Sequence, residues 1–341
     1  MKIHNVTCRL GPTSATLVTN DESVLTYLSD FYTLTGDASA IDEWLVEAIV
    51  GPADDSMDTN AWGVSYSSNP IARRLRLRST DPGNLAITAR KAVREALVDY
   101  CEQRRYAMLH ASAVVDDQRV IIVVGDKGSG KTTLGLKAAL FHGMRYLSND
   151  HLIVYPEPAA GTDALASRLA LTSLPTPIPL KVGTFLDLQH RLPAPWDTEG
   201  LDIDAHRAIP REQLYKLDQR VLYTFAGLGQ DSPIQASLTD ASTGPAVLVV
   251  LASYTNGTPT EATEVADPID ALMAHVRSDW MFDPTLNQRY LPRHERQSAE
   301  YEADAQRLVT ALAERAAVFR WDHRGDPAPL LNHPALKVRQ P

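Results

Sequence analysis

The residues whose types and spacing point most directly to chemistry lie between positions 125 and 132. They read Gly-Asp-Lys-Gly-Ser-Gly-Lys-Thr, which fits the pattern G-x-x-x-x-G-K-[ST] at every fixed position. In such a loop the glycines let backbone N–H groups turn toward phosphate oxygens, the lysine reaches the β- and γ-phosphates, and the hydroxyl ligates Mg²⁺. The pattern therefore predicts a site for ATP and Mg²⁺. The predicted nucleotide contacts are Gly125, Asp126, Lys127, Gly128, Ser129, Gly130, Lys131, Thr132 and Thr133.

The segments on either side of this loop are predicted to be a strand and a helix, which is the context that a phosphate-binding loop requires. Residues 120–124 form a short apolar run rich in β-branched side chains, which is typical of a buried strand. Residues 133–142 read as a helix that Gly143 ends. A glycine-rich turn before an ordinary helix is the alternative, but strand, loop and helix together favour a phosphate site. For Lys127, inside the loop, contact with a phosphate and exposure to solvent both remain open.

Two further polar positions lie before and after the loop in the sequence. His110 lies in Leu-His-Ala-Ser-Ala-Val at residues 109–114, just before a predicted hairpin, and Asp150 ends the sequence Leu-Ser-Asn-Asp at residues 147–150. This order of strand, hairpin, phosphate loop and polar strand end resembles the core of HPr kinase/phosphorylase. That core is itself similar to the nucleotide site of phosphoenolpyruvate carboxykinase. The resemblance covers residues 108–155, and the proline-rich residues 174–181 are similar to HPr kinase-related proteins less specifically.

The resemblance implies a role for each matching residue. Lys131 would act on the phosphates, His110 would lie beside the transferred phosphate, and Asp150 would either bind the metal together with Thr132 or accept the proton of the acceptor hydroxyl. Asn149 departs from the family's paired aspartates, because an amide can ligate through its oxygen but supplies no charge. From the residues alone, Asp150 could equally be a turn or helix-capping aspartate, and His110 a hydrogen-bonded core histidine.

The function that the motif and the resemblance predict is transfer of the γ-phosphate of ATP to a hydroxyl. The acceptor would be a serine or threonine of a peptide or small protein, or a small metabolite, and some related proteins serve peptide natural-product pathways. The chain shows no copy of the Arg-Gly-Leu-Gly signature of HPr kinases, so another acceptor is expected. The alternative is an ATPase or nucleotide-dependent regulator without an acceptor. Such proteins usually carry a second apolar strand ending in an acid, whereas the candidate strand, residues 247–253, is followed by Tyr254. Asn149 also suggests a third possibility, a binder without catalytic activity.

Composition limits the classes of protein that the chain can belong to. It has 341 residues, 44% of them hydrophobic and 22% charged, and a formal net charge of −9. An acidic balance argues against a general nucleic-acid binder. Cys8 and Cys101 are its only cysteines and have no metal-binding spacing, which suits a reducing compartment. No apolar run is long enough to span a bilayer. We therefore expect a cytoplasmic protein without a membrane partner, and the resemblance allows a homo-oligomer.

The positions of these motifs predict two domains. Residues 1–105 should form a smaller α+β module for substrate recognition or assembly, and residues 106–341 a mixed-sheet α/β kinase domain with the phosphate loop. In the module we expect helices at 22–32, 41–50 and 85–104 and strands at 62–66 and 71–78. Arg74, Arg76 and Arg78 alternate along the last strand, either as solvated surface or as a face for an acidic partner.

The second domain should carry a strand at 106–115, a hairpin turn at 116–118 and the loop strand at 119–124. Further strands are expected at 145–147, 152–155, 164–174, 247–253 and 318–321, and helices at 269–277 and 297–316. The tail from Asp326 holds four prolines and is expected to be surface-bound or mobile.

Overall fold

The computed structural model contains both helices and strands, with several mixed sheets. It describes residues 2–36, 44–53, 56–157, 168–230, 234–238, 244–287, 289–292 and 296–336. The chain divides into two compact units. The first contains Met1–Tyr106 and Ser278–Tyr301, and the second contains Ala107–Gln230, Ile234–Arg277 and Glu302–Pro341. The chain thus leaves the first unit at Tyr106 and returns to it later, most extensively at Ser278–Tyr301.

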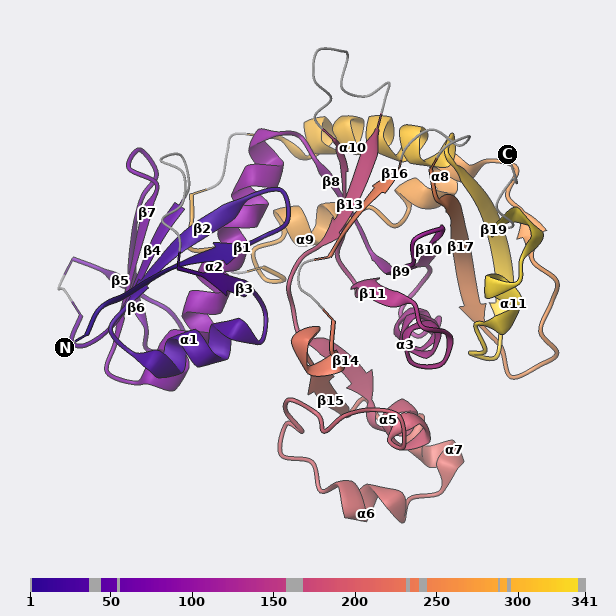
Figure 1. Ribbon diagram of the computed structural model, residues 1–341, viewed down its shortest axis with the longest axis horizontal. Helices are drawn as coiled ribbons and strands as arrows, with labels where there is room; N and C mark the ends of the chain where they lie inside the picture. Colours follow the sequence, from indigo (N-terminus) through magenta and orange to yellow (C-terminus); the bar gives the residue numbers. More distant parts are fainter. Residues whose placement is uncertain are drawn as a thin grey trace. The chain divides into compact units, whose positions relative to one another are not determined.

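The first unit is built on a sheet with the strand order β3-β1-β2-β4-β7-β6-β5 among its described residues (Figure 1). Strands β2, β4 and β7 are parallel neighbours, while β1 and β6 pair antiparallel with the strands beside them. The strands are β1 (His4–Arg9), β2 (Ser14–Thr19), β3 (Thr33–Thr35), β4 (Trp44–Val50), β5 (Asp58–Thr59), β6 (Ser65–Asn69) and β7 (Arg74–Ser79).

Two helices cover this sheet and match the helices expected near residues 22–32 and 85–104. Helix α1 spans Glu22–Ser29 and helix α2 spans Pro82–Gln103. Helix α2 packs against β4 and β7, and α1 packs against α2. The later segment contributes α9 (Ser278–Phe282). Both predictions of a helix are confirmed. The two helices form where the sequence provides an aspartate at the N-cap and an apolar stripe that is buried.

The helix expected over residues 41–50 was wrong, because β4 occupies Trp44–Val50. Residues 41–43 lie outside the described residues. The alternate side chains of Trp44, Val46 and Ala48 are buried, which is the period of a strand. Trp44, Leu45, Ala48 and Ile49 also have helical spacing, so the pattern alone was ambiguous. Pairing with β2 on one side and β7 on the other decides for a strand.

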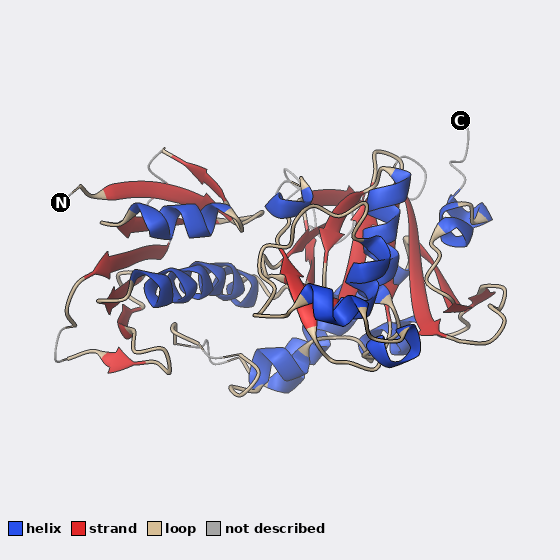
Figure 2. Ribbon diagram, turned by 90° about the horizontal axis from the view of Figure 1, so that it is seen from below, coloured by secondary structure: helices blue, strands red, loops and turns tan. Residues whose placement is uncertain are grey.

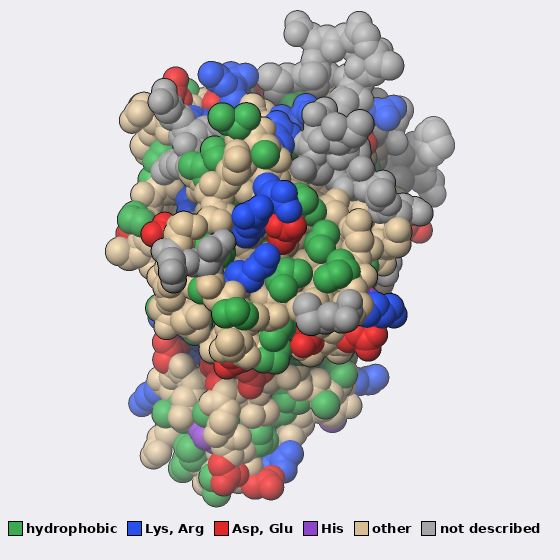
Figure 3. Space-filling model, turned by 90° about the vertical axis from the view of Figure 1, so that its left-hand side faces the viewer, with side chains coloured by type: hydrophobic (Ala, Val, Ile, Leu, Met, Phe, Trp, Pro, Cys, Tyr) green, Lys and Arg blue, Asp and Glu red, His purple; other side chains and the backbone are tan. Residues whose placement is uncertain are grey.

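Two of the three arginines that alternate along β7 pair with a carboxylate of the neighbouring strand. The Arg74 guanidinium forms a bidentate ion pair with Glu47 of β4. Its Nε donates to Glu47 Oε2 at 2.9 Å, and its terminal nitrogen donates to Oε1. Arg76 also lies 3.3 Å from the same carboxylate. These contacts hold the pKa of Glu47 below its usual range, although burial alone would raise it. The ladder is therefore partly neutralised within the sheet, and basic side chains lie beside acidic ones on the face in Figure 3.

The second unit is organised around a six-stranded sheet of order β11-β9-β10-β17-β19-β18. Strands β10, β17 and β19 are parallel neighbours, and β9 lies antiparallel between β10 and β11. The expected hairpin around residues 116–118 is confirmed by the pairing of β9 with β10. These strands are β9 (Ala111–Val115), β10 (Arg119–Val124), β11 (Arg145–Ser148), β17 (Ala246–Tyr254), β18 (Thr263–Glu264) and β19 (Ala316–His323).

The two faces of this sheet are buried against different layers, and Figure 2 shows helices on both sides of these strands. On one face Ile122 and Val249 pack with Leu308 and Leu312 of α10 (Ser298–Ala313). On the other face Val123 and neighbouring residues pack with α3 (Lys131–His142). The loop strand β10 is apolar on both faces for this reason, which explains its run of β-branched residues.

The strand expected over residues 106–115 is divided at His110. Strand β8 (Ala107–Leu109) joins a four-stranded sheet of order β16-β13-β12-β8, whereas β9 joins the six-stranded sheet. The other strands of the four-stranded sheet are β12 (Leu152–Pro156), β13 (Leu169–Ser173) and β16 (Gln235–Leu238). His110 therefore lies at the point where the chain passes between two sheets. The start of the strand expected at 164–174 falls on residues 164–167, which lie outside the described residues.

A smaller set of elements follows the four-stranded sheet. Strands β14 and β15 form a two-stranded antiparallel sheet, and short helices lie beside it in the sequence. These elements are β14 (Ile178–Lys181), β15 (Arg220–Tyr223), α5 (Val182–Leu188), α6 (Ile203–Arg207), α7 (Arg211–Leu214) and the 3₁₀ turn η1 (Ala226–Leu228). The expected helix at 269–277 is α8 (Pro268–Met273), which ends earlier than expected.

The expectation of a surface-bound or mobile tail was wrong for residues 326–336. The chain forms α11 (Ala328–Leu331) and a 3₁₀ turn η2 (Pro334–Leu336). Leu330, Leu331 and Leu336 are buried in the same core as α3. Proline is tolerated at the start of a short helix, so the proline content does not prevent packing. Among the described residues, no helix has the length and apolar character needed to cross a bilayer.

Candidate functional site

The candidate site begins where β10 ends and α3 starts. Gly130 occupies the N-cap position of α3 in a left-handed conformation, with φ 87°, and no side chain caps the helix. The first N–H groups of a helix have no partner within the helix, and the helix dipole makes this end partly positive. Because no side chain satisfies them here, these N–H groups can bind an anion.

Two of the fixed glycines of the pattern are required by close packing. A Cβ atom at Gly125 would lie 2.4 Å from the carbonyl oxygen of Ala252, and one at Gly130 would lie 2.7 Å from Cε1 of His323. Both glycines also have positive φ values, 147° and 87°, that other residues rarely adopt. The loop is therefore a closely packed turn that only these glycines permit.

Lys131 is folded over the loop that precedes it. Its side chain is 6% exposed, and its Nζ donates to the carbonyl oxygens of Gly125 at 2.6 Å and Asp126 at 3.1 Å. Burial lowers the pKa of this amine, and the charge of Arg277 acts in the same direction, while Asp150 and Asp126 oppose the shift. An ammonium group has three donors, so one remains for a phosphate oxygen at the loop.

The hydroxyl of Thr132 is oriented by Asn149. Thr132 Oγ1 donates to Asn149 Oδ1 at 2.8 Å, and the Tyr146 hydroxyl donates to the same oxygen at 2.9 Å. Ser112 donates in turn to Tyr146 at 3.1 Å. Asn149 is 2% exposed, so this network is buried beside the first turn of α3. Because Thr132 gives its proton to Asn149, its oxygen lone pairs are left to face a cation.

Asp150 and His110 form a pair beside this network. His110 Nε2 lies 3.5 Å from Asp150 Oδ1, and both side chains are about one third exposed. Asp150 adopts φ 65°, a left-handed conformation that aspartate tolerates better than most residues. Burial raises the pKa of Asp150, but the hydrogen bond from His110 and the charges of His151, His110 and Lys131 outweigh it and lower the pKa. The carboxylate therefore stays ionised at neutral pH.

Residues 275–277 run alongside the site and were not found by sequence reasoning. The N–H of His110 donates to the carbonyl of His275 at 2.8 Å, and the N–H of Arg277 donates to the carbonyl of Met108 at 2.8 Å. Burial lowers the pKa of His275, and the charge of Lys131 lowers it further. This backbone pairing brings two more nitrogen-bearing side chains toward the same region. No local motif marks it, since the paired segments are far apart in the sequence.

His323 also supports the loop, and sequence reasoning missed it. It is 0% exposed at the end of β19. The N–H of Gly325 donates to its Nδ1 at 2.8 Å, so its Nε2 carries the proton and donates to the carbonyl of Ser129, also at 2.8 Å. Trp321 stacks on its ring, with centroids 5.0 Å apart. The sequence does show a histidine at the end of an expected strand. To place that histidine at the loop, however, one must know that its strand lies parallel to the loop strand in the same sheet.

The remaining predicted contacts differ in their surroundings. Lys127 is exposed and lies 3.5 Å from the carboxylate of Asp218, which favours the solvated alternative. The Ser129 hydroxyl is buried without a hydrogen-bond partner in the described part of the chain. The Thr133 methyl would lie 3.7 Å from a Cβ atom at Gly325, so this residue faces the segment that follows β19.

The residues at the loop fit a magnesium ion that is bound together with a nucleotide. Among the described residues, no group of three or more histidines, cysteines, aspartates or glutamates is arranged to hold a metal by itself. Mg²⁺ usually takes one or two protein oxygens and completes its shell with phosphate oxygens and water. The Thr132 hydroxyl and the ionised Asp150 carboxylate supply oxygens of that kind.

Comparison with known proteins adds no family to this description. No protein-family model matches the chain, and no curated protein matches it. The function is therefore inferred from the site itself.

Proposed function

We propose that this chain is an ATP-dependent phosphotransferase with an HPr kinase-like phosphate-loop core, which transfers the γ-phosphate to a hydroxyl group. The acceptor is a serine or threonine of a peptide or small protein, or a small metabolite. The observation that carries the proposal is the hydrogen bond from Thr132 to Asn149, because it holds the end of β11 against the first turn of α3. Asp150 and His110 then lie beside the loop that would hold the phosphates.

Each residue has a role that follows from its surroundings. Phosphoryl transfer proceeds mainly by positioning the reactants and neutralising charge on the phosphate oxygens. The loop N–H groups and Lys131 hold the β- and γ-phosphates, and Thr132 and Asp150 would hold Mg²⁺, which neutralises phosphate charge. A carboxylate with a lowered pKa binds a cation well and takes up a proton poorly, so the pKa of Asp150 favours the ligand role over the base role. His110 keeps the carboxylate ionised and oriented.

The strand beside the loop strand favours a kinase over an ATPase without an acceptor. β17 is the parallel neighbour of β10 and ends in Ala252, Ser253 and Tyr254. A nucleotide-driven switch usually needs an acid at such a strand end to hold a metal or to orient water. This strand end carries none, whereas the ionised carboxylate at the site belongs to Asp150, which follows β11 on the other side of the loop strand.

The experiment is incubation with MgATP and candidate acceptors, followed by mass spectrometry of the acceptors and measurement of ADP and free phosphate. The candidate acceptors are serine- and threonine-containing peptides, small proteins and hydroxyl metabolites. An acceptor that becomes heavier by one phosphoryl group supports the proposal. ADP and free phosphate without a modified acceptor would instead establish an ATPase. The Lys131→Ala variant is the control for activity from contaminating kinases.

A further inference from the structure

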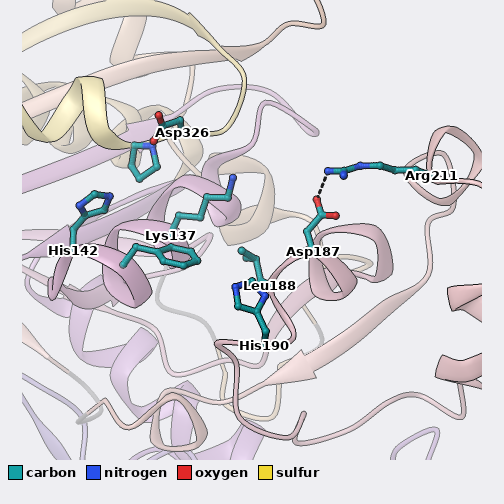
Figure 4. Close-up of a pocket in the computed structure, with 9 residues that line it drawn as sticks. Lys137, His142, Asp187, Leu188, His190, Arg211 and Asp326 are labelled. Atoms are coloured by element: carbon teal, nitrogen blue, oxygen red, sulfur yellow. Dashed lines mark hydrogen bonds and ion pairs between the residues drawn. The ribbon is translucent and has the colours of Figure 1, made fainter.

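A pocket of about 430 Å³ lies in the second unit beside helix α3 (Figure 4). Its walls come from the second half of α3, from α5 and the residues that follow it, and from the segment after β19. Figure 4 shows the Lys137 side chain extending into the pocket, with Asp326 on one side and Asp187 on the other. The pocket thus shares helix α3 with the candidate phosphate loop, and the segment after β19 lies close to both.

The pocket lies at a distance from the loop that a nucleotide can span. Lys137 follows Lys131 on the same helix, about 9 Å farther along the axis at about 1.5 Å per residue. A Cβ atom at Gly325 would lie 3.8 Å from Lys137 Nζ and 3.7 Å from the Thr133 methyl. The segment after β19 therefore touches both the start of α3 and the pocket residue Lys137. Phe141 lies one turn beyond Lys137, about 6 Å farther along the axis. An extended nucleotide with its α-phosphate near Thr133 and its ribose near Lys137 therefore carries its base toward Phe141.

The pocket carries an aromatic surface that the fold leaves uncovered. Phe141 is 41% exposed although most large apolar side chains of this unit are buried. The His190 ring lies beside it, with centroids 6.4 Å apart, and the Arg191 guanidinium lies 5.6 Å from the centre of the Phe141 ring. Flat aromatic and guanidinium groups arranged in this way form a platform on which a base stacks.

The polar groups of the pocket differ in how far they are already engaged. Arg211 pairs with Asp187 at 2.8 Å, and the Tyr215 hydroxyl donates to the same carboxylate. Asp326 accepts from the N–H of Ala328 at 3.0 Å through one oxygen, which leaves its other oxygen available. Lys137 forms no ion pair with any residue that the structure describes. One donor and one acceptor are therefore free to meet the edge of a base or the hydroxyls of a ribose.

We propose that this pocket holds the adenosine part of the ATP whose phosphates the loop binds. The base stacks on Phe141, while Lys137 and Asp326 contact its polar edge or the ribose. The inference rests on the proposed function, because it assigns the rest of the same substrate. It adds a site for the base and ribose, which the phosphate-loop pattern does not locate.

The test compares a ligand that has the base with one that lacks it. Binding of MgATP and of magnesium tripolyphosphate is measured by titration calorimetry for the full-length protein and for Phe141→Ala. Removal of one aromatic partner of a stacked base weakens binding by about 5- to 100-fold. We expect a loss of this size for MgATP and a change of less than about twofold for tripolyphosphate, since the latter reaches only the loop. Phe141→Tyr keeps the ring and should restore the affinity for MgATP.

Leu286→Ala is the matched control, because it also shortens an exposed apolar side chain, 52% exposed, in the other unit. It should leave the affinity for both ligands unchanged. Equal affinity of Phe141→Ala and the unmodified protein for MgATP would overturn the pocket assignment while leaving the proposed function in place. Equal weakening of both ligands would overturn it as well, since the loss would then not concern the base. Failure of the unmodified protein to bind either ligand would overturn both the proposed function and the inference.

Discussion

Two turns of this molecule lead from a parallel strand into a helix, and they differ in whether a side chain caps the helix N-terminus. In the first unit β7 leads to α2, and the Asp81 side chain accepts from the N–H groups of Gly83 and Asn84 at 2.8 and 3.1 Å. In the second unit β10 leads to α3, whose N-cap is Gly130 without any capping side chain. The same element of structure is closed by the chain's own carboxylate in one unit and left open in the other.

The difference shows what a phosphate site needs beyond a helix N-terminus. A carboxylate at the N-cap satisfies the same N–H groups that would bind an external anion. At α3 the chain supplies glycines in place of the carboxylate, and it adds the amine of Lys131 and the hydroxyl of Thr132 in the first turn. The open turn of α3 lacks the stabilisation that a cap provides and is available to a ligand. The closed turn of α2 is expected to contribute stability alone.

The largest effect on the open turn is expected from Lys131→Ala. The substitution removes the amine that reaches the phosphates, so phosphotransfer should fall by about 10³-fold or more. The measurement is the initial rate of ATP-dependent acceptor modification, together with the melting temperature as a check of folding.

Lys127→Ala is the control for this prediction. Lys127 lies in the same loop but is exposed and pairs only with the exposed Asp218. Its loss should change the rate and the stability little, because exposed ion pairs contribute about 0–1 kcal/mol. Phosphotransfer by Lys131→Ala at the rate of the unmodified protein would remove the loop from the mechanism.

The next largest effect is expected from Asp150→Asn, which should lower the rate on the order of 10²-fold. The pKa of Asp150 lies below its ordinary value of 3.8, so the folded protein keeps this carboxylate ionised until the pH falls below that range. Protonation of Asp150 should therefore not limit the rate between pH 5 and 8. If Asp150 is a metal ligand, Mn²⁺ or high Mg²⁺ should partly restore the rate of the variant.

A second outcome would assign the base role to Asp150 instead. In that case added metal would not restore the rate of Asp150→Asn, and the pH–rate profile of the variant would lose its acidic limb. Unchanged turnover in this variant would contradict both roles. These outcomes concern Asp150 alone, because the oxygen of the neighbouring Asn149 already accepts from two hydroxyls and its amide carries no charge.

The sequence was sufficient to predict the parts of the site that are contiguous in the chain. The glycine loop, the strand before it and the helix after it follow from local pattern, and their positions agree with β10 and α3. The hairpin of β9 and β10 follows from its turn residues for the same reason. Local signals of this kind depend on neighbouring residues and need no tertiary information.

The parts that were missed depend on contacts between distant segments. Strand β4 was read as a helix because its apolar spacing fits both periods, and only its two neighbouring strands decide between them. His323 reaches the loop because β19 lies beside β17, and residues 275–277 reach it by pairing with residues 108–110. Sequence spacing does not encode these neighbours, since strand order is a property of the folded chain.

A smaller effect on the open turn is expected from His323→Leu. The substitution leaves the Ser129 carbonyl and the Gly325 N–H without their partner, so stability should fall by about 1–3 kcal/mol. The loop should also be less well positioned, which should weaken MgATP binding. His323→Gln can still donate to Ser129 and should weaken binding less than leucine does. Equal binding of MgATP by both variants and the unmodified protein would show that the loop needs no support from β19.

His323 should also make the stability of the protein depend on pH. Burial lowers the pKa of His323 below its ordinary value of 6.5. Below pH 6.5 the unfolded chain takes up a proton that the folded chain does not. The contribution of His323 to the free energy of unfolding is therefore full above pH 6.5 and is lost as the pH falls. The free energy of unfolding of His323→Leu should therefore decrease less between pH 7 and 5 than that of the unmodified protein. Denaturant unfolding at both pH values measures this difference, and equal decreases would contradict it.

The smallest effect is expected at the closed turn, from Asp81→Ala. Loss of an N-cap side chain costs about 0.5–2 kcal/mol of stability, and Asp81→Asn should recover most of it because its amide oxygen still accepts from the helix. Affinity for MgATP should not change. The variant frees the N–H groups of α2, yet it should not acquire measurable affinity for inorganic phosphate, because this turn has neither a lysine in its first helical residues nor the glycine-rich loop of α3. Phosphate binding that appears only in Asp81→Ala would show that an uncapped helix N-terminus is sufficient in this fold. The glycines and Lys131 would then not be what distinguishes the open turn.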